Sequence, residues 1–365
     1  FGYDAGQNGI GRLTSFSDPS GDTALAYDAL GRVTSRTQIV TGTAARTVSY
    51  GFTSGLRTQI TYPSGRIVQY AWAGGRVMWI TVNGTPLLSN VTYHPFGAPQ
   101  SWQWGNGTNY SRSYDADGRA VGFAVGASTR TPSYDAAGQL VSIADTVPAL
   151  NQGFGYDTLG RVTGYTEASG NRAYGYDANG NRTSITIGAN SYPYATVSGK
   201  NRLASTAGPP PARSFGYDAA GNVTGDGSAS FAYDARARMI SATKAGQTTS
   251  YALNALGERV KKTGPFVPTG TNVFVHDEDG RLLGEYDAAG NALAEYVWLA
   301  DWPVAVILPG NQIYYLHPDQ LGTPRAVLDT QNRLRWRWHS DPFGDLPPEE
   351  NPEGLGVFTF NLRFP

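Results

Sequence analysis

The sequence repeats one short phrase, in which Tyr-Asp is followed by two small or apolar residues, a glycine and a basic or polar residue. It reads AYDALGRVTSRT from residue 26, GYDTLGRVTGYT from residue 155, GYDANGNRTSIT from residue 175, GYDAAGNVTG from residue 216 and EYDAAGNALAEY from residue 285. Random order would give about one Tyr-Asp pair to a chain with 22 Tyr and 21 Asp among 365 residues, whereas nine occur. Such a chain folds as an array of similar units, and the unit sets the fold class.

Each phrase predicts a tight turn. An aspartate at the first position of a type I turn accepts a backbone N–H two residues on, and a glycine at the fourth position adopts positive φ at little steric cost. A type I turn followed by a left-handed residue forms a three-residue hairpin loop with a bulge. The predicted structural turn positions are Tyr27, Asp28 and Gly31; Tyr156, Asp157 and Gly160; Tyr176, Asp177 and Gly180; Tyr217, Asp218 and Gly221; and Tyr286, Asp287 and Gly290.

The residues between the turns indicate β-strands. β-branched residues cluster after each glycine, as in RVT at 161–163, and no helical period competes with this pattern. Turns that begin at Asp157, Glu167 and Asp177 are ten residues apart, which leaves about six residues for each strand. We therefore predict an all-β fold of antiparallel β-hairpin repeats, each of roughly 20 residues.

The repeat tyrosines have two interpretations. Because they occupy the same place in successive hairpins, the sequence predicts that they lie near one another as an aromatic ladder that fixes the register of the sheet. The alternative is an exposed strip of tyrosine faces that binds sugars. Packing is favoured, because each tyrosine is tied so closely to a turn.

Composition narrows the possible partners. The net charge is -1 and there is no long run of Lys or Arg, so nucleic acid and anionic membrane lipid are not expected partners. The absence of cysteine excludes disulfides and thiol catalysis. The most apolar stretch, 297–308, is interrupted by Asp301 and Pro303 and is shorter than the roughly 20 residues that span a bilayer. The chain begins at FGYD and ends at NLRFP, so we expect a piece of a longer protein.

Catalytic and metal-binding chemistry is not predicted. The sequence lacks the common dinucleotide, phosphate, acyl-transfer and zinc-protease motifs, and we assign no catalytic, cofactor-binding or metal-binding residue. Two His-x-Asp patterns, His317/Asp319 and His339/Asp341, leave a metal site open. Their neighbouring Pro and turn residues favour backbone hydrogen bonding instead.

The remaining charged residues also have structural interpretations. The repeat aspartates are better explained as turn caps than as a glycosidase pair. Arginines that follow a turn glycine are expected at solvated strand ends or in pairs with a neighbouring Asp. A row of arginines that binds a polyanion is the alternative, and the net charge counts against it. The arginines concerned are Arg32, Arg66, Arg76, Arg119, Arg161 and Arg281.

The last part of the chain adds longer motifs, YYLHPDQLGTPRAVLD from residue 314, RWRWHSDPFG from residue 335 and NLRFP from residue 361. With the YDxxGR repeats, they resemble the RHS/YD-repeat family of bacterial polymorphic toxins, insecticidal toxin complexes and teneurins. The resemblance implies a YD-repeat array over 1–272, degenerate in 1–113, and the start of the RHS-associated core region over 273–365. It also implies a long β-sheet that spirals as part of a hollow shell.

The resemblance further implies a function. The chain is expected to be a shell segment of a secreted or cell-surface bacterial toxin that encloses a C-terminal toxin segment of the same polypeptide, with delivery-system proteins as further partners. It is not expected to be an enzyme, because the family's self-cleavage site, of the Asp-Pro-x-Gly-Leu type, lies beyond the point where this chain stops. Asp341, within SDPFGDL, is not assigned that role. The alternative function is an adhesin that binds glycans or a receptor through aromatic rows.

Overall fold

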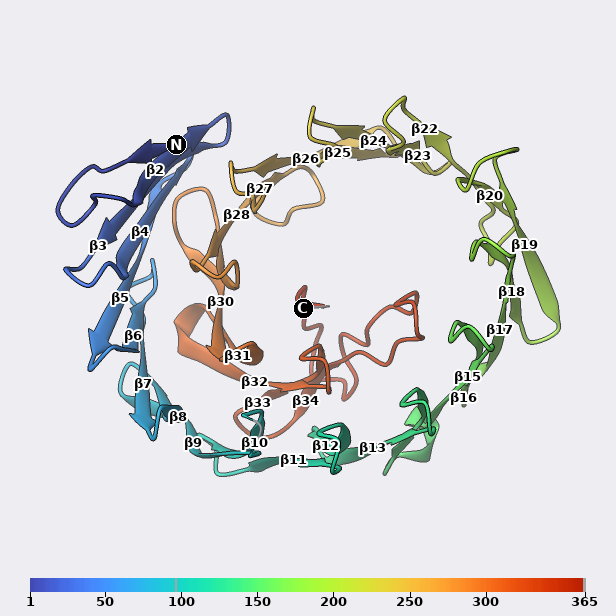
Figure 1. The fold of residues 1–365 in the computed structure, drawn as a ribbon, viewed down its shortest axis with the longest axis horizontal. Coiled ribbons are helices and arrows are strands. Elements are labelled where there is room, and N and C mark those ends of the chain that lie inside the picture. The colour runs from blue at the N-terminus through green and yellow to red at the C-terminus, as the bar shows by residue number, and fades with distance from the viewer. Residues whose placement is uncertain (96, 364–365) are drawn as a thin grey trace. The chain divides into compact units, whose positions relative to one another are not determined.

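The computed structural model describes residues 1–95 and 97–363. They form 34 β-strands and two short 3-10 helices, and none of the described residues lies in an α-helix (Figure 1). No helix in this part of the chain is long and apolar enough to cross a membrane. The predicted all-β fold of antiparallel hairpin repeats is confirmed.

The strands follow one another closely along the chain. In the first stretch they are β1 (Gly2–Tyr3), β2 (Leu13–Asp18), β3 (Gly21–Tyr27), β4 (Val33–Val40), β5 (Ala45–Thr53), β6 (Leu56–Thr61), β7 (Ile67–Ala73), β8 (Arg76–Val82), β9 (Thr85–Tyr93), β10 (Pro99–Trp104) and β11 (Asn109–Tyr114). In the middle they are β12 (Ala120–Val125), β13 (Ser128–Tyr134), β14 (Leu140–Asp145), η1 (Pro148–Leu150), β15 (Gln152–Tyr156), β16 (Val162–Glu167), β17 (Gly170–Tyr176), β18 (Arg182–Ile187), β19 (Asn190–Thr196), β20 (Leu203–Thr206), β21 (Arg213–Ser214), β22 (Gly216–Tyr217), β23 (Val223–Gly225), β24 (Ala229–Tyr233) and β25 (Met239–Lys244). In the last stretch they are β26 (Gln247–Leu253), β27 (Arg259–Thr263), β28 (Thr271–His276), β29 (Leu282–Tyr286), β30 (Ala292–Leu299), β31 (Trp302–Leu308), η2 (Pro309–Asn311), β32 (Gln312–Pro318), β33 (Pro324–Asp329) and β34 (Leu334–Arg337).

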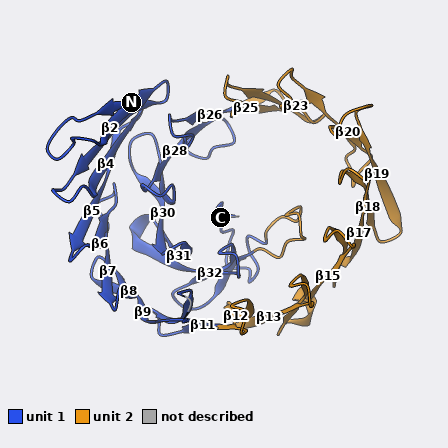
Figure 2. Ribbon diagram, viewed as in Figure 1, with its two compact units in different colours: residues 1–112, 249–337, 349–365 blue, residues 113–248, 338–348 orange. Residues whose placement is uncertain are grey.

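The chain divides into two compact units (Figure 2). Unit 1 comprises Phe1–Arg112, Thr249–Arg337 and Glu349–Pro365, and unit 2 comprises Ser113–Thr248 and Trp338–Pro348. Each unit therefore combines stretches that are far apart in the sequence. A domain boundary between residues 272 and 273 stays a prediction.

The hairpins have a β-bulge beside the tyrosine of the phrase. In the β3–β4 hairpin Ala26 lies opposite Ser35 but Tyr27 lies opposite Val33, so Thr34 is an extra residue. The bulge lets a type I turn match the right-handed twist of the strands. The same register shift adjoins Tyr156, Tyr176, Tyr217 and Tyr286.

Unit 1 contains two packed layers of strands, with β4–β11 in one and β27–β33 in the other (Figure 1). Val40, Val260 and Val273 form a buried cluster between them. The Tyr62 hydroxyl donates a hydrogen bond to the Tyr296 carbonyl oxygen at 2.7 Å. The layers are therefore joined by both apolar and polar contacts.

β31 is buried on both of its faces. Residues 303–307 are all buried, without the alternation of a strand that faces water on one side. The described part of the chain after β34 covers this layer, because the ring of Phe358 lies 4.6 Å from that of Tyr314 and the ring of Phe360 lies 5.2 Å from that of Trp336. Two-sided cover explains why this stretch of sequence is the most apolar.

Unit 2 has a smaller core. Tyr165, Tyr174 and Ile185 form a buried cluster, and the segment 338–348 packs on it through Phe343, whose ring lies 4.9 Å from that of Tyr174. By contrast, none of the residues of β19–β25 is buried. These strands, which belong to the end of one sheet (β19–β21) and the start of the other (β22–β25), therefore lack a second layer from unit 2 itself.

Candidate functional site

The aspartate of each phrase organises its turn. One carboxylate oxygen of Asp157 accepts hydrogen bonds from the backbone N–H groups of Leu159, at 2.9 Å, and Arg161, at 3.0 Å. The other oxygen binds the Arg161 Nε at 2.7 Å. Asp28 makes the same contacts with Leu30 and Arg32. The phrase therefore closes a turn by means of its own residues.

The other three turns use asparagine in place of arginine. The side-chain amides of Asn181, Asn222 and Asn291 donate to their turn aspartates at 2.8, 2.8 and 2.7 Å. The fourth position is left-handed in every turn, with φ of 80° at Gly31, 75° at Gly160, 84° at Gly180, 94° at Gly221 and 103° at Gly290. Only glycine adopts this conformation at low cost.

These hydrogen bonds hold the pKa of the turn aspartates below its ordinary value. For Asp28 and Asp157 the largest cause is the backbone N–H of the following arginine, and for Asp177, Asp218 and Asp287 it is the asparagine side chain. The carboxyls are ionised at neutral pH and carry no proton to donate. Their geometry suits capping rather than acid catalysis.

Four of the five repeat tyrosines bind the preceding hairpin. The hydroxyl of Tyr176 donates to the Val162 carbonyl oxygen at 2.8 Å, and the Arg161 guanidinium lies 4.9 Å from the centre of the tyrosine ring. Tyr27, Tyr156 and Tyr217 donate in the same way to the carbonyls of Leu13, Leu140 and Leu203. The tyrosine is therefore a link from one repeat to the one before it.

Among the described residues, the repeat tyrosines make no ring contacts with one another, and this holds for any two of Tyr27, Tyr156, Tyr176, Tyr217 and Tyr286. An aromatic ladder that fixes the register therefore stays a prediction. Arg12 stands over Tyr27 and Arg202 over Tyr217, so cations and carbonyl groups occupy the space between repeats. Tyr286 differs again: it is fully buried and donates its hydroxyl proton to Glu295 at 2.6 Å.

Replacing Gly180 with valine should destabilise unit 2 by about 1–2 kcal/mol, because a β-branched residue is strained at positive φ. A Cβ at Gly180 would meet no atom within 4 Å, so the backbone alone determines the cost. Gly180→Asn should cost less, since asparagine tolerates the left-handed region. Thermal unfolding followed by circular dichroism measures both. Equal melting curves for wild type and Gly180→Val would contradict this explanation of the turn.

Buried ion pairs join the two layers of unit 1. Arg36 pairs with Glu258 and also donates to the Asp277 carbonyl oxygen at 2.9 Å. Arg66 pairs with Glu295, whose side chain is fully buried. The sequence analysis missed these pairs, since their members lie more than 200 residues apart. The available signal was a charged residue within a strand, such as Glu295 in ALAEYVWL.

His276 stands where the turns carry tyrosine, and its burial gives unit 1 a pH dependence. Burial lowers the pKa of His276 to about 4; Glu258 opposes this, and Arg36 and Arg259 add to it. The unfolded chain, with an ordinary pKa of 6.5, then binds more protons than the folded chain between these two values. Stability is therefore complete above about pH 6.5 and falls as pH drops toward 4.

In the wild type, His276 should lower the free energy of unfolding of unit 1 by up to about 3 kcal/mol as the pH drops from 6.5 to 4. We expect His276→Gln to abolish this part of the decrease. Urea unfolding at several pH values measures it by tryptophan fluorescence, which reports mainly on unit 1 because seven of the eight Trp lie there. At pH 7.5, above both pKa values of His276, the protonation of this residue does not contribute to the difference between wild type and variant. Parallel wild-type and variant slopes would show that His276 does not titrate on unfolding.

In unit 2 a buried polar cluster holds the segment 338–348 on β15–β17. Gln152 Nε2 donates to the Ser340 carbonyl oxygen at 2.9 Å, and His339 Nε2 lies 3.2 Å from Glu167 Oε2. Arg172 binds Glu167 at 2.8 Å and lies 3.8 Å from Asp341. Although burial raises it, the pKa of Glu167 is held below its ordinary value by hydrogen bonds from Ser169 and Arg172.

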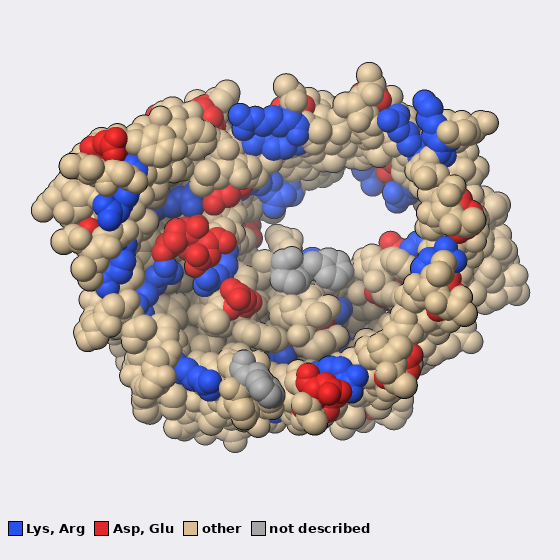
Figure 3. All heavy atoms as spheres, viewed as in Figure 1, with Lys and Arg blue, Asp and Glu red and all other residues tan. Residues whose placement is uncertain are grey.

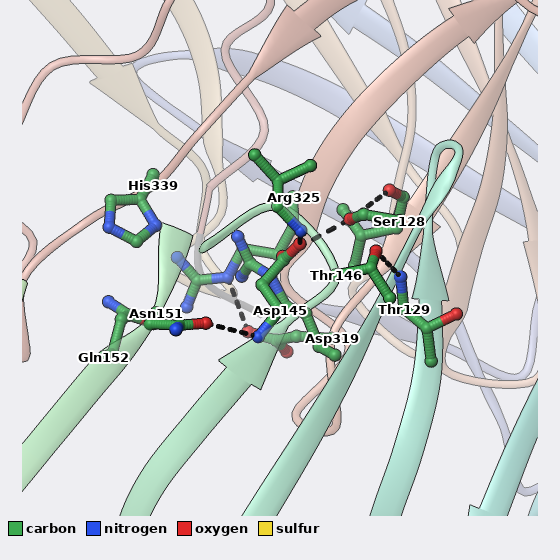
Figure 4. Close-up of polar contacts among 12 residues, drawn as sticks. Ser128, Thr129, Asp145, Thr146, Asn151, Gln152, Asp319, Arg325 and His339 are labelled. Atoms are coloured by element: carbon green, nitrogen blue, oxygen red, sulfur yellow. Dashed lines mark hydrogen bonds and ion pairs between the residues drawn. The ribbon is translucent and has the colours of Figure 1, made fainter. Parts of the chain in front are cut away.

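Asp145 is another buried carboxylate of unit 2. Asp145 Oδ2 accepts hydrogen bonds from Ser128 Oγ at 3.3 Å and from Arg130 Nε at 3.1 Å. Its backbone N–H donates to Asn151 Oδ1 at 2.7 Å, which closes the connection through η1 (Figure 4). The Asp145 side chain is fully buried, so its carboxylate does not face solvent.

The two His-x-Asp patterns belong to turns of the repeat type. Asp319 Oδ1 accepts from the N–H groups of Leu321 and Thr323, and Asp341 Oδ1 accepts from Phe343 and Asp345. In the described ranges, no group of three or more His, Asp or Glu side chains is placed to hold a metal ion. The backbone hydrogen bonds account for both aspartates.

The arginines after turn glycines are mostly neutralised. Arg32, Arg119, Arg161 and Arg281 pair with the aspartate of their own turn, and Arg66 pairs with Glu295. On the face drawn in Figure 3, basic side chains lie beside acidic ones. Arg76 alone of the six has no carboxylate partner among the described residues.

Family models match two parts of the chain. The teneurin YD-shell model matches residues 130–360, and the RHS repeat model matches residues 8–51. The predicted RHS/YD-repeat resemblance is thereby confirmed.

The curated relatives are much longer than this chain. The tRNA(Glu)-specific nuclease WapA of Bacillus subtilis subsp. natto is 25% identical over 135 residues, which are 36% of this chain and 6% of that protein. The tRNA3(Ser)-specific nuclease WapA of Bacillus spizizenii is 24% identical over a stretch of the same length and the same shares. The chain thus spans 6% of the length of these relatives.

Solved structures share the fold. The Photorhabdus luminescens Tc holotoxin pore superposes with a TM-score of 0.75 at 17% identity, over 92% of this chain and 20% of that chain. The crystal structure of TcdB2-TccC3-TEV gives a TM-score of 0.74 at 16% identity, over 92% of this chain and 21% of that one. With a family model that spans well over half of its residues, the chain belongs to the teneurin YD-shell family.

Proposed function

We propose that this chain is a wall segment of a bacterial RHS-type shell that encloses a C-terminal effector of the same polypeptide. The observation that carries the proposal is the thin cover of strands β19–β25 in unit 2, none of whose residues is buried. Tyr192 and Tyr194 of β19 pack beside the core cluster but remain half-buried, and Phe231 and Tyr233 of β24 are also half-buried on one face of their strand. A further polypeptide would cover this aromatic surface.

The relatives support the same proposal. The WapA proteins are named as tRNA nucleases, and the matched 135 residues are a small part of each. Because the match covers only 6% of each relative, it is compatible with a wall segment that is separate from the effector. The role we infer is structural rather than enzymatic, in a secreted or cell-surface protein, with the enclosed effector and delivery-system proteins as partners.

The adhesin alternative is less well supported. It needs exposed aromatic rows, whereas the repeat tyrosines are partly buried and donate their hydroxyl protons to backbone carbonyls. The Arg161 guanidinium also stands over the ring of Tyr176, so less of that ring is open to a sugar.

Mass spectrometry of the full-length protein from its native source tests the proposal. Under native conditions we expect one particle whose mass includes a second polypeptide, and under denaturing conditions we expect that polypeptide to separate. Limited proteolysis before denaturation should leave the second polypeptide intact if it is enclosed. A shell chain that travels alone with intact flanks, or a second polypeptide that is digested at once, would contradict enclosure.

A further inference from the structure

Unit 1 contains a cavity of about 480 Å³ between its two layers, beside β7 and β8 on one side and the connection from β28 to β29 on the other. Five aromatic residues line it, Phe52, Tyr70, Trp72, Tyr93 and Trp298. The volume lies within the range of small-molecule sites, roughly 300–1,000 Å³. The cavity therefore has room for a ring-sized ligand.

The aromatic walls are fixed in place by backbone hydrogen bonds. Trp72 Nε1 donates to the Arg57 carbonyl oxygen at 2.8 Å, Trp298 Nε1 to that of Leu282 at 2.9 Å, and the Tyr93 hydroxyl to that of Val77 at 2.8 Å. These polar groups are satisfied within the protein, so the rings offer apolar surface to whatever enters. Little ordering of these walls would be needed on binding, which favours affinity.

One charge in the cavity has no carboxylate partner among the described residues, and the sequence explains why. The hairpin between β7 and β8 turns through Gly74 and Gly75 alone, with φ of 57° and 76°. It lacks the turn aspartate that pairs with Arg32, Arg119, Arg161 and Arg281 in their own turns. Arg76, which lines the cavity, lies 5.1 Å from the centre of the Tyr93 ring and forms no ion pair with any described residue.

The other charged groups limit the ligand to a single negative charge. Arg281 and Arg57 also line the cavity, but both are paired. Arg281 pairs with Asp279 at 2.5 Å and lies 3.7 Å from Asp277. Arg57 pairs with Glu278. Burial raises the pKa of Asp277. A phosphate dianion would meet the acidic side chains of Asp277 and Asp279, whereas a carboxylate needs only Arg76.

We propose that this cavity binds a small ring compound that bears one carboxylate, with the ring against the tryptophan and tyrosine walls and the carboxylate on the Arg76 guanidinium. Two sources share this chemistry, an acidic sugar and an aromatic acid. The site does not depend on the enclosing role proposed above, because it lies within unit 1 and needs no effector.

Isothermal titration calorimetry with four probes tests the proposal on the whole chain. The probes are D-glucuronate, benzoate, and the neutral D-glucose and benzyl alcohol. We expect one acid to bind at least about tenfold more tightly than its neutral counterpart, since a charge-assisted pair with Arg contributes at least that factor. Which acid binds identifies the source. If neither acid binds, or if the neutral compound binds as tightly, the proposal is wrong.

A matched pair of variants locates the site. Arg76→Met should weaken binding about tenfold or more. Arg202→Met is the control, since Arg202 also stands over a repeat tyrosine without an ion pair, in unit 2 and away from the cavity. It should bind as wild type does. Equal affinities for the two variants would overturn the assignment of Arg76, and circular dichroism of both confirms that they fold.

Discussion

Replacing Glu295 with alanine is expected to lower the free energy of unfolding of unit 1 by about 3–5 kcal/mol, the cost of leaving one member of a buried pair alone. Glu295 is fully buried and binds Arg66, the Ser64 hydroxyl and the Tyr286 hydroxyl. Without the carboxylate, the Arg66 charge stays in a place that water does not reach. Urea unfolding followed by tryptophan fluorescence measures the loss.

Glu278→Ala is the matched control. Glu278 pairs with Arg57 between the same two layers, but the side chains are 26% and 22% exposed. Solvent screens such a pair, so its loss should cost less than about 1 kcal/mol. If the two variants lose equal stability, burial does not determine the strength of these links.

Replacing Arg172 with methionine should release the segment 338–348 from the sheet of unit 2. Arg172 is the cation between the buried carboxylates of Glu167 and Asp341, whose side chains are 3% and 0% exposed. We expect a loss of about 3 kcal/mol, which corresponds to roughly a hundredfold faster amide exchange. Hydrogen exchange at Phe343 and Asp345, whose N–H groups bind Asp341, reports it directly.

Arg119→Met separates this effect from a general loss of charge. Arg119 pairs with Asp115 in unit 2, but its side chain is 36% exposed, so exchange in 338–348 should stay as in wild type. Unchanged exchange in Arg172→Met would mean that Tyr174 and its ring contact with Phe343 hold the segment without the ion pairs.

The local features of this fold could be predicted because their causes are local. Each turn depends on contacts between residues no more than four apart, such as Asp157 with Arg161. The phrase contains all of these residues, so the phrase alone predicts the turn, the left-handed glycine and the hairpin.

The links between hairpins and layers could not be predicted in the same way. The phrase does not show that Tyr176 reaches the carbonyl of Val162, 14 residues earlier, or that an arginine separates one tyrosine from the next. The partner of Arg36, 222 residues away, depends on how two layers meet. Arg172 and Asp341 likewise meet only because a later segment returns to an earlier sheet. Periodicity within a hairpin carries no information about such returns.

The tyrosine link has a consequence for how such chains change length. Because the Tyr176 hydroxyl and the Arg161 side chain join only adjacent hairpins, this link holds each repeat to its nearest neighbours. Deleting or duplicating one whole hairpin would bring together a tyrosine and a carbonyl of the same kind as before. The sheet can therefore lengthen or shorten by whole hairpins without needing a new kind of contact between neighbouring repeats.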